Sequence, residues 1–289
     1  MKQFGLGLIL ASCVFGSMAT AQESVTHNGL DADFYAADGE TAVLLLHGTL
    51  AHNRMEIIAT IAGLVADDYG FPVLAPNLSY QLPGREGMLD CGITHRHKDT
   101  AAVEEIAQWV DYLESQGYQK IVVSAHSRGG AQMSAYLAER ASARIGGAVL
   151  IAPAVYDAEY AASNYQKRFG VSLAEIMAQA QSVAPDTVMD VPGFVYCENA
   201  KATAASVLDY YTPRDNRDTP TNLTKVTLPV LVIAGSEDDV VAGLPKALET
   251  TSGIGDNVSL EMLEGADHFF RDLYADDIAA AIADMAESQ

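Results

Sequence analysis

The clearest chemical signal in the chain is a serine flanked by small residues. Ser127 lies in the segment AHSRG, residues 125–129, between an apolar run and a segment with helical character. A serine held in a sharp strand-to-helix turn needs small residues two positions away, because larger side chains would collide with the turn. Gly129 meets this need, and Ala125 meets it if its φ angle stays negative. The segment therefore predicts a nucleophilic serine.

Two later segments contain the groups that would activate such a serine. They are GSED, residues 235–238, and GADH, residues 265–268. A serine hydroxyl is a weak nucleophile near neutral pH, and imidazole, with an ordinary pKa of about 6.5, is a suitable base for it. His268 is therefore the predicted base. An acid must fix the tautomer of that imidazole, and Asp238 and Asp239 are the candidates.

Apolar runs and helical patterns alternate along the chain. Val103, Ile106 and Val110 recur at helical spacing between two of the runs, and residues 258–262 alternate like a half-exposed edge strand. Such alternation predicts parallel β-α-β units with helices on both faces of one sheet, and it places the candidate residues at the carboxyl ends of strands. The continuous apolar runs, typical of strands buried on both faces, are 42–46, 71–75, 121–125, 148–152 and 230–234.

Residues 155–222 interrupt this alternation. The interval is rich in tyrosine and phenylalanine, and residues 173–181 and 202–208 have helical character. Its length predicts a small helical cap over the sheet edge, which leaves 22–154 and 223–289 as the core. The aromatic residues are interpreted either as the cap's own core or as walls of a substrate pocket.

With these motifs in this order, the chain resembles the α/β-hydrolase superfamily, in particular a serine esterase or lipase with a helical cap. The resemblance extends from about Thr41 to Met285. It implies an α/β-hydrolase fold, a mostly parallel central sheet with helices on both faces. It also implies that carboxylic esters are cleaved through an acyl-serine intermediate on Ser127, with no cofactor. Amide, thioester or lactone hydrolysis and a non-catalytic binding role are the alternatives.

The resemblance also assigns site residues. The family order is serine, acid, histidine, and the family spacing after Gly235 favours Asp238 over Asp239 as the acid. The segment HGTL, residues 47–50, resembles the family's oxyanion loop. The backbone N–H groups of Thr49 and Arg128 are then the expected oxyanion donors, with Leu50 as the alternative to Thr49. Ala125 departs from the glycine that is usual at its position.

Composition and charge restrict the class of protein. The chain has 289 residues, 49% of them hydrophobic, with 38 acidic and 17 basic residues and a net charge of −21. This charge repels phosphate backbones, so no nucleic-acid partner is expected, and a small, neutral ester is the expected substrate. His95 and His97 have no third ligand at a diagnostic spacing, so no metal site is predicted. No integral membrane span is expected either.

The first residues are typical of an export signal. Residues 1–21 combine Lys2, an apolar stretch at 4–15 and small residues ending at Ala21. These are the three parts of a secretory signal peptide, so the sequence predicts a periplasmic or secreted protein. Lipoprotein anchoring at Cys13 is the alternative.

Removal of such a signal leaves two cysteines, Cys91 and Cys197. In an oxidising compartment an even pair of cysteines predicts a disulfide, and two buried thiols are the alternative.

Overall fold

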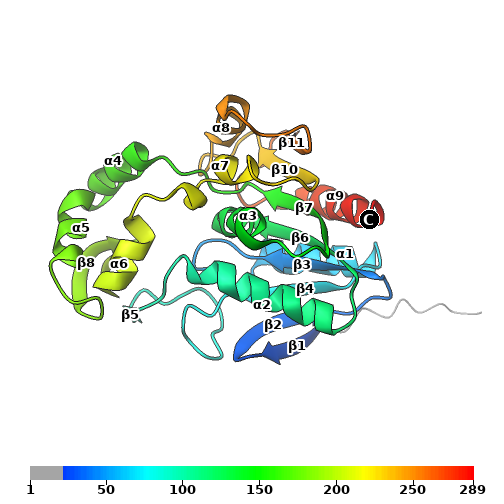
Figure 1. Ribbon diagram of the computed structural model, residues 1–289, viewed down its shortest axis with the longest axis horizontal. Coiled ribbons are helices and arrows are strands. Elements are labelled where there is room, and N and C mark those ends of the chain that lie inside the picture. The colour runs from blue at the N-terminus through cyan, green and yellow to red at the C-terminus, as the bar shows by residue number, and fades with distance from the viewer. Residues whose placement is uncertain (1–21) are drawn as a thin grey trace, which may run out of the picture.

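The computed structural model describes residues 22–289, which form a central eight-stranded sheet with helices on both faces (Figure 1). Strands β3, β4, β6, β7, β10 and β11 are parallel, whereas β1 and β2 add an antiparallel hairpin at the β4 edge. The strands, in their order across the sheet, are β1 (Gln22–His27), β2 (Leu30–Tyr35), β4 (Val73–Asn77), β3 (Thr41–Leu46), β6 (Lys120–His126), β7 (Ile145–Ile151), β10 (Val230–Gly235) and β11 (Val258–Leu263). The predicted mostly parallel central sheet with helices on both faces is confirmed.

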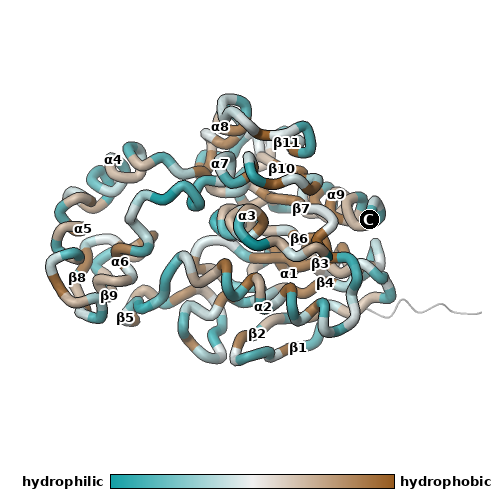
Figure 2. The backbone as a smooth tube through the Cα atoms, viewed as in Figure 1, coloured by the Kyte–Doolittle hydropathy of each residue, from teal (hydrophilic) through white to brown (hydrophobic). Residues whose placement is uncertain are grey.

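The central strands are apolar because both of their faces are covered (Figure 2). Residues 42–46 of β3 and 121–126 of β6 are buried throughout. Burial of each large aliphatic side chain contributes about 1.5–3 kcal/mol relative to exposure, so these strands anchor the core. β11 is an edge strand, as predicted, but its alternating sequence is not matched by alternating burial, because residues 259–262 are all exposed.

Four helices cover the sheet. α1 (Glu56–Asp67) and α9 (Tyr274–Glu287) pack together on one face, and α2 (Ala101–Ser115) and α3 (Arg128–Arg140) pack together on the other (Figure 1). The apolar stripe predicted for α2 is buried, including Ile106 and Val110. A shorter helix, α8 (Leu244–Thr250), connects β10 to β11.

The interval between β7 and β10 forms a lobe at one side of the sheet (Figure 1). It contains helices where the sequence suggests them, together with an antiparallel hairpin that the sequence analysis did not predict. Strand β5 (Thr94–His95) joins this hairpin to make a three-stranded sheet in the order β5-β9-β8. The elements of the lobe are α4 (Ala158–Phe169), α5 (Leu173–Gln181), β8 (Val188–Phe194), β9 (Cys197–Thr203), α6 (Ala204–Tyr211), the 3-10 helix η1 (Asp215–Arg217) and α7 (Thr219–Leu223).

A disulfide between Cys91 and Cys197 connects this lobe to the loop before β5. The predicted pairing is therefore confirmed. Phe194, which pairs with Cys197 across the β8–β9 hairpin, and Tyr210 are buried against each other, so several lobe aromatics form the lobe's own core. None of the helices within residues 22–289 is long and apolar enough to cross a membrane. The predicted signal peptide and Cys13 lie outside the described residues.

Candidate active site

Ser127 occupies the turn between β6 and α3 in a strained backbone conformation. Its φ is +57°, a region that side chains other than glycine rarely adopt. The conformation is fixed by a hydrogen bond from the Ser127 N–H to the Ile151 carbonyl, at 2.9 Å. A Cβ on Gly129 would lie 2.2 Å from the His47 carbonyl oxygen, so the turn requires glycine there. Ala125 stays outside the positive-φ region, which is why alanine fits at its position.

The structure brings three of the predicted residues together at the carboxyl edge of the sheet. His268 Nε2 lies 2.9 Å from Ser127 Oγ, and His268 Nδ1 lies 2.8 Å from Asp238 Oδ2. All three side chains are buried. Asp239, the alternative acid, is exposed.

The hydrogen bonds around Asp238 determine the tautomer of His268. Asp238 Oδ1 accepts the backbone N–H groups of Val240 and Val241, at 2.8 and 2.9 Å, which leaves Oδ2 to face His268 Nδ1. Because an ionised carboxylate only accepts hydrogen bonds, His268 Nδ1 carries the proton. The lone pair of Nε2 then faces the Ser127 hydroxyl, as a general base requires.

His126 supports this arrangement, in a role that the sequence analysis did not assign. Its Nε2 lies 2.8 Å from the His268 carbonyl oxygen, and the two rings are 4.9 Å apart. Burial, followed by the charge of His268, lowers the pKa of His126 to about 4. His126 is therefore neutral near pH 7 and donates Nε2–H to the backbone of His268. The sequence signal for this role is the position of His126 directly before Ser127, which places its side chain next to His268.

The loop at residues 47–50 lies against the serine. A Cβ on Gly48 would lie 3.1 Å from Ser127 Cβ, so the loop approaches the elbow closely. His47 holds this loop: its Nε2 accepts the Leu78 N–H at 3.0 Å, and its Nδ1 lies 2.9 Å from the Gly48 carbonyl oxygen. Burial lowers the pKa of His47 to about 3, so this residue is a neutral structural group.

The two expected oxyanion donors belong to segments that meet. Arg128 begins α3, and its Nε lies 3.3 Å from Thr49 Oγ1. Leu50, the alternative donor, has a φ of +48°, and its carbonyl oxygen accepts the Leu89 N–H at 2.9 Å.

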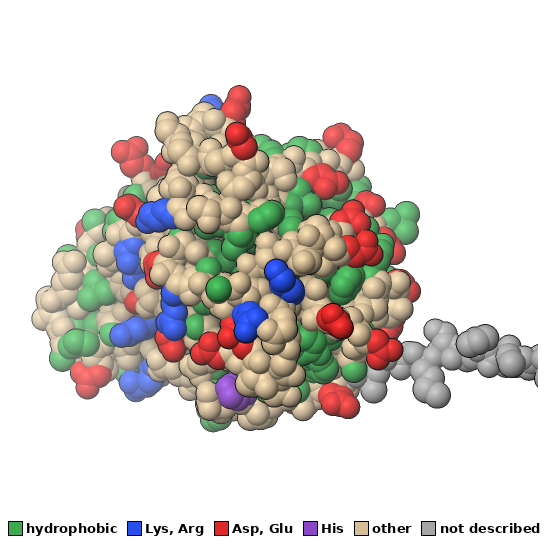
Figure 3. All heavy atoms as spheres, turned by 45° about the vertical axis from the view of Figure 1, so that its right-hand side comes forward, with side chains coloured by type: hydrophobic (Ala, Val, Ile, Leu, Met, Phe, Trp, Pro, Cys, Tyr) green, Lys and Arg blue, Asp and Glu red, His purple; other side chains and the backbone are tan. Residues whose placement is uncertain are grey.

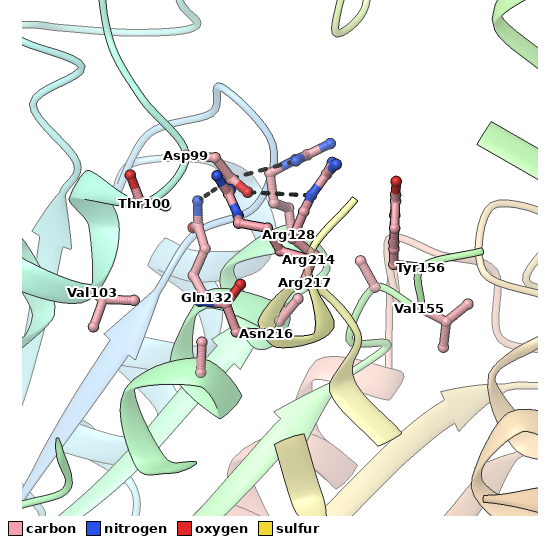
Figure 4. Close-up of a pocket in the computed structure, with 13 residues that line it drawn as sticks. Asp99, Thr100, Val103, Arg128, Gln132, Val155, Tyr156, Arg214, Asn216 and Arg217 are labelled. Carbon is pink, nitrogen blue, oxygen red and sulfur yellow. Dashed lines mark hydrogen bonds and ion pairs between the residues drawn. The ribbon is translucent and has the colours of Figure 1, made fainter. Parts of the chain in front are cut away.

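A pocket of about 90 Å³ opens next to Arg128, between α3 and the lobe (Figure 4). Arg214 and Arg217 of the lobe line it together with Asp99 and Tyr156. No sequence motif marks these residues, because they come from three distant segments and only the folded chain brings them together.

His95 and His97 belong to an aromatic cluster. His97 Nδ1 lies 2.9 Å from the Tyr210 hydroxyl, and the His95 ring is 5.0 Å from the Phe194 ring. Across residues 22–289, no group of three or more His, Cys, Asp or Glu side chains is arranged to hold a metal ion.

Comparison with known proteins adds two findings. A family model described as "Alpha/beta hydrolase family" matches residues 43–281. Among curated proteins, none matches the sequence.

Solved structures share the architecture at low sequence identity. Est1E from Butyrivibrio proteoclasticus has a TM-score of 0.59 and 16% identity, covering 92% of this chain and 98% of its own. Est1E with bound ferulic acid has a TM-score of 0.62 and 18% identity, with the same coverage of 92% and 98%. The monoacylglycerol lipase of Paleococcus ferrophilus has a TM-score of 0.60 and 16% identity, covering 90% of this chain and 99% of its own.

Proposed function

Since the chain belongs to the alpha/beta hydrolase family, we propose that it is an exported serine hydrolase that cleaves carboxylic esters through an acyl-enzyme intermediate on Ser127. The observation that carries this proposal is the position of His268 between Ser127 Oγ and Asp238 Oδ2, at 2.9 and 2.8 Å. Ester chemistry is also consistent with the structural neighbours, which include a monoacylglycerol lipase and a Pyrococcus furiosus esterase.

In the acylation step, Ser127 Oγ attacks the ester carbonyl carbon while His268 Nε2 takes the hydroxyl proton. The carbonyl electron pair moves onto oxygen, where the backbone N–H groups of Thr49 and Arg128 stabilise the charge. Each donor of this kind typically increases the reaction rate by about 10²–10³-fold. The carboxylate of Asp238 stabilises the imidazolium that has formed.

Collapse of this intermediate breaks the bond to the alcohol. The departing oxygen takes the proton from His268 Nε2, and the acyl group stays on Ser127. Water then enters, gives its proton to the same nitrogen and attacks the acyl carbon. A second collapse returns the proton to Ser127 Oγ and releases the carboxylic acid.

The disulfide supports the export part of the proposal. Disulfides such as Cys91–Cys197 persist in oxidising compartments and are rare in the cytosol. Cell fractionation and amino-terminal sequencing of the mature chain test this part. A mature chain that retains residues 1–21 in the cytosol would contradict it.

Replacement of the serine tests the catalytic part. We expect Ser127→Ala to lower kcat for a neutral ester by at least about 10⁴-fold, because removal of a triad nucleophile removes the acyl-enzyme route. It should also abolish labelling by an alkyl fluorophosphonate. Ser124→Ala is the matched control, since its buried hydroxyl, in the preceding strand β6, has no hydrogen-bond partner among the described residues. Retained esterase activity in Ser127→Ala would refute the proposal.

A further inference from the structure

Three arginine side chains converge in the pocket beside the candidate triad. Arg128 directly follows Ser127 in the chain, whereas Arg214 and Arg217 come from the start and the end of the η1 turn in the lobe. Figure 4 shows their guanidinium groups gathered around Asp99 at one opening. The volume of about 90 Å³ admits a group of a few heavy atoms.

The carboxylates in this pocket do not balance the arginines. Asp99 lies 3.5 Å from Arg128 Nη1 and 3.8 Å from Arg217 Nε, so two guanidinium groups share one carboxylate. Asp99 also accepts a hydrogen bond of 2.9 Å from Gln132. Arg214 pairs instead with a second carboxylate, Asp209, at 3.4 Å. Three positive charges thus face two negative charges.

Some of the arginine N–H groups have no acceptor. Arg217 Nη1 and Arg214 Nε are buried without a hydrogen-bond partner among the described residues, and the Arg217 side chain is only 11% exposed. Burial lowers the pKa of Arg217, and the charge of Arg128 lowers it further. Buried donors normally have partners, so these groups are available to an incoming acceptor.

Aromatic rings hold two of the guanidinium groups in place. Arg217 lies over the Tyr156 ring, 4.3 Å from its centre, and Arg128 lies 5.7 Å from the centre of the Tyr210 ring. A guanidinium fixed in this way presents its donors in a planar fork, which matches the two oxygens of a carboxylate.

Two residues of the pocket wall, Arg128 and Ala154, connect it to the site of acyl transfer. Arg128 Nε contacts Thr49 Oγ1 in the loop expected to bind the oxyanion. Ala154, in the pocket wall, donates its N–H to the Ser127 carbonyl at 3.0 Å. A group bound by the arginines would therefore lie beside the reacting ester.

From these contacts, and on the basis of the proposed function, we propose that the pocket binds a free carboxylate on the substrate, and that the preferred substrates are small anionic esters. The net charge of −21 favours a neutral ester, so this proposal runs against the sequence-based expectation. The three arginines of the pocket outweigh the net negative charge, because a substrate carboxylate contacts several guanidinium groups at short range. The charges elsewhere on the surface are screened beyond about 8–10 Å. Figure 3 shows most basic side chains of this face toward the lobe side, with acidic ones on both sides and most of them along the opposite rim.

Matched substrate pairs test the proposal and show which side of the ester carries the carboxylate. For the acyl side the pair is ethyl hydrogen glutarate and its amide, ethyl glutaramate. For the alcohol side it is butyryloxyacetic acid and butyryloxyacetamide. We expect kcat/KM for the acid to exceed that for the amide by at least about tenfold in one pair, as suits charge-assisted hydrogen bonds. Glutarate should also inhibit hydrolysis of a neutral ester competitively.

Substitutions in the pocket give the second test. Arg217→Gln and Arg214→Gln should each lower the acid-to-amide ratio of kcat/KM about tenfold, because each removes charge-assisted hydrogen-bond donors to the substrate carboxylate. Arg144→Gln is the matched control. It removes the same charge from the amino end of β7, at the opposite edge of the sheet, and should leave the ratio unchanged.

The outcomes separate this proposal from the proposed function. Equal activity on acid and amide in both pairs, with Ser127-dependent hydrolysis of neutral esters intact, would overturn the carboxylate pocket alone. The acid-to-amide ratio does not depend on how much of a variant is folded. A variant with lower activity on both members of a pair but an unchanged ratio would therefore also count against the pocket. Absence of any ester hydrolysis by the wild-type protein would overturn both proposals.

Discussion

Asp238 and Asp239 are neighbours in the chain with different surroundings. Asp238 is buried and bonded to His268 and to two backbone N–H groups, whereas Asp239 is exposed. We expect Asp238→Asn to lower kcat by roughly 10⁴-fold, since an amide would favour the wrong tautomer of His268. Asp239→Asn, which removes the same charge one position away, should change kcat less than about twofold. Steady-state kinetics on a neutral ester compares them, and equal effects would refute the assignment of Asp238.

The sequence predicted this group of residues because each follows its strand in a short motif. Ser127, Asp238 and His268 lie at the ends of β6, β10 and β11 or in the loops after them, so the topology of a parallel sheet is enough to bring them together. Arg214 and Arg217 follow no core strand. Their position depends on how the lobe packs on α3, which no local pattern records.

The strand-turn-helix element around Ser127 depends on one close backbone approach. A Cβ on Gly129 would meet the His47 carbonyl oxygen at 2.2 Å, and neither backbone segment can move without displacing the elbow or the loop at residues 47–50. We expect Gly129→Ala to abolish most esterase activity and to lower the free energy of unfolding by about 1–3 kcal/mol.

Gly63→Ala is the control for this substitution. Gly63 also lies in a helix, α1, and a Cβ there would have no heavy atom within 4 Å. Alanine should stabilise that helix by about 0.5–1 kcal/mol and leave activity unchanged. Urea unfolding and steady-state kinetics measure both variants, and an active Gly129→Ala enzyme would contradict this account of the turn.

The β1–β2 and β8–β9 hairpins were not predicted from the sequence, for two different reasons. The β1–β2 hairpin turns at Asn28 and Gly29, both with positive φ, so an Asn-Gly turn signal was present in the sequence and was missed. The β8–β9 hairpin turns at Val195 and Tyr196, with Val195 at a φ of +58°. A β-branched residue is not a turn signal, so packing within the lobe determines that turn.

The disulfide fixes the lobe through the same hairpin. Cys197 begins β9, and Cys91 lies in the loop before β5, 106 residues earlier. We expect the double variant Cys91→Ala, Cys197→Ala to lose about 2–5 kcal/mol of stability, as is typical when a disulfide closing a long loop is removed. Amide hydrogen exchange should increase most in β8 and β9. An unchanged urea midpoint, with or without reductant, would contradict this expectation.

At the scale of the whole molecule, stability should depend on buried histidines that are neutral in the fold, and three of them have strongly lowered pKa values. Burial is the largest cause of the lowered pKa in each case, to about 3 for His47 and His97 and about 4 for His126. In the unfolded chain their ordinary pKa is about 6.5, so the unfolded state binds more protons as the pH falls below that value. The stabilisation is thus fully present above pH 6.5 and is lost progressively down to about pH 4 for His126 and about pH 3 for His47 and His97.

Each such group contributes a slope of about 1.4 kcal/mol per pH unit within this window, so urea midpoints should fall steeply between about pH 6.5 and 4. His97→Gln removes one titrating group away from the triad and should flatten the slope by about a third, even though it also loses the hydrogen bond to Tyr210. The slope, rather than the absolute stability, is the diagnostic quantity, because a purely structural effect of the substitution would lower stability equally at every pH. Parallel curves for the two proteins would show that His97 is not held neutral by the fold.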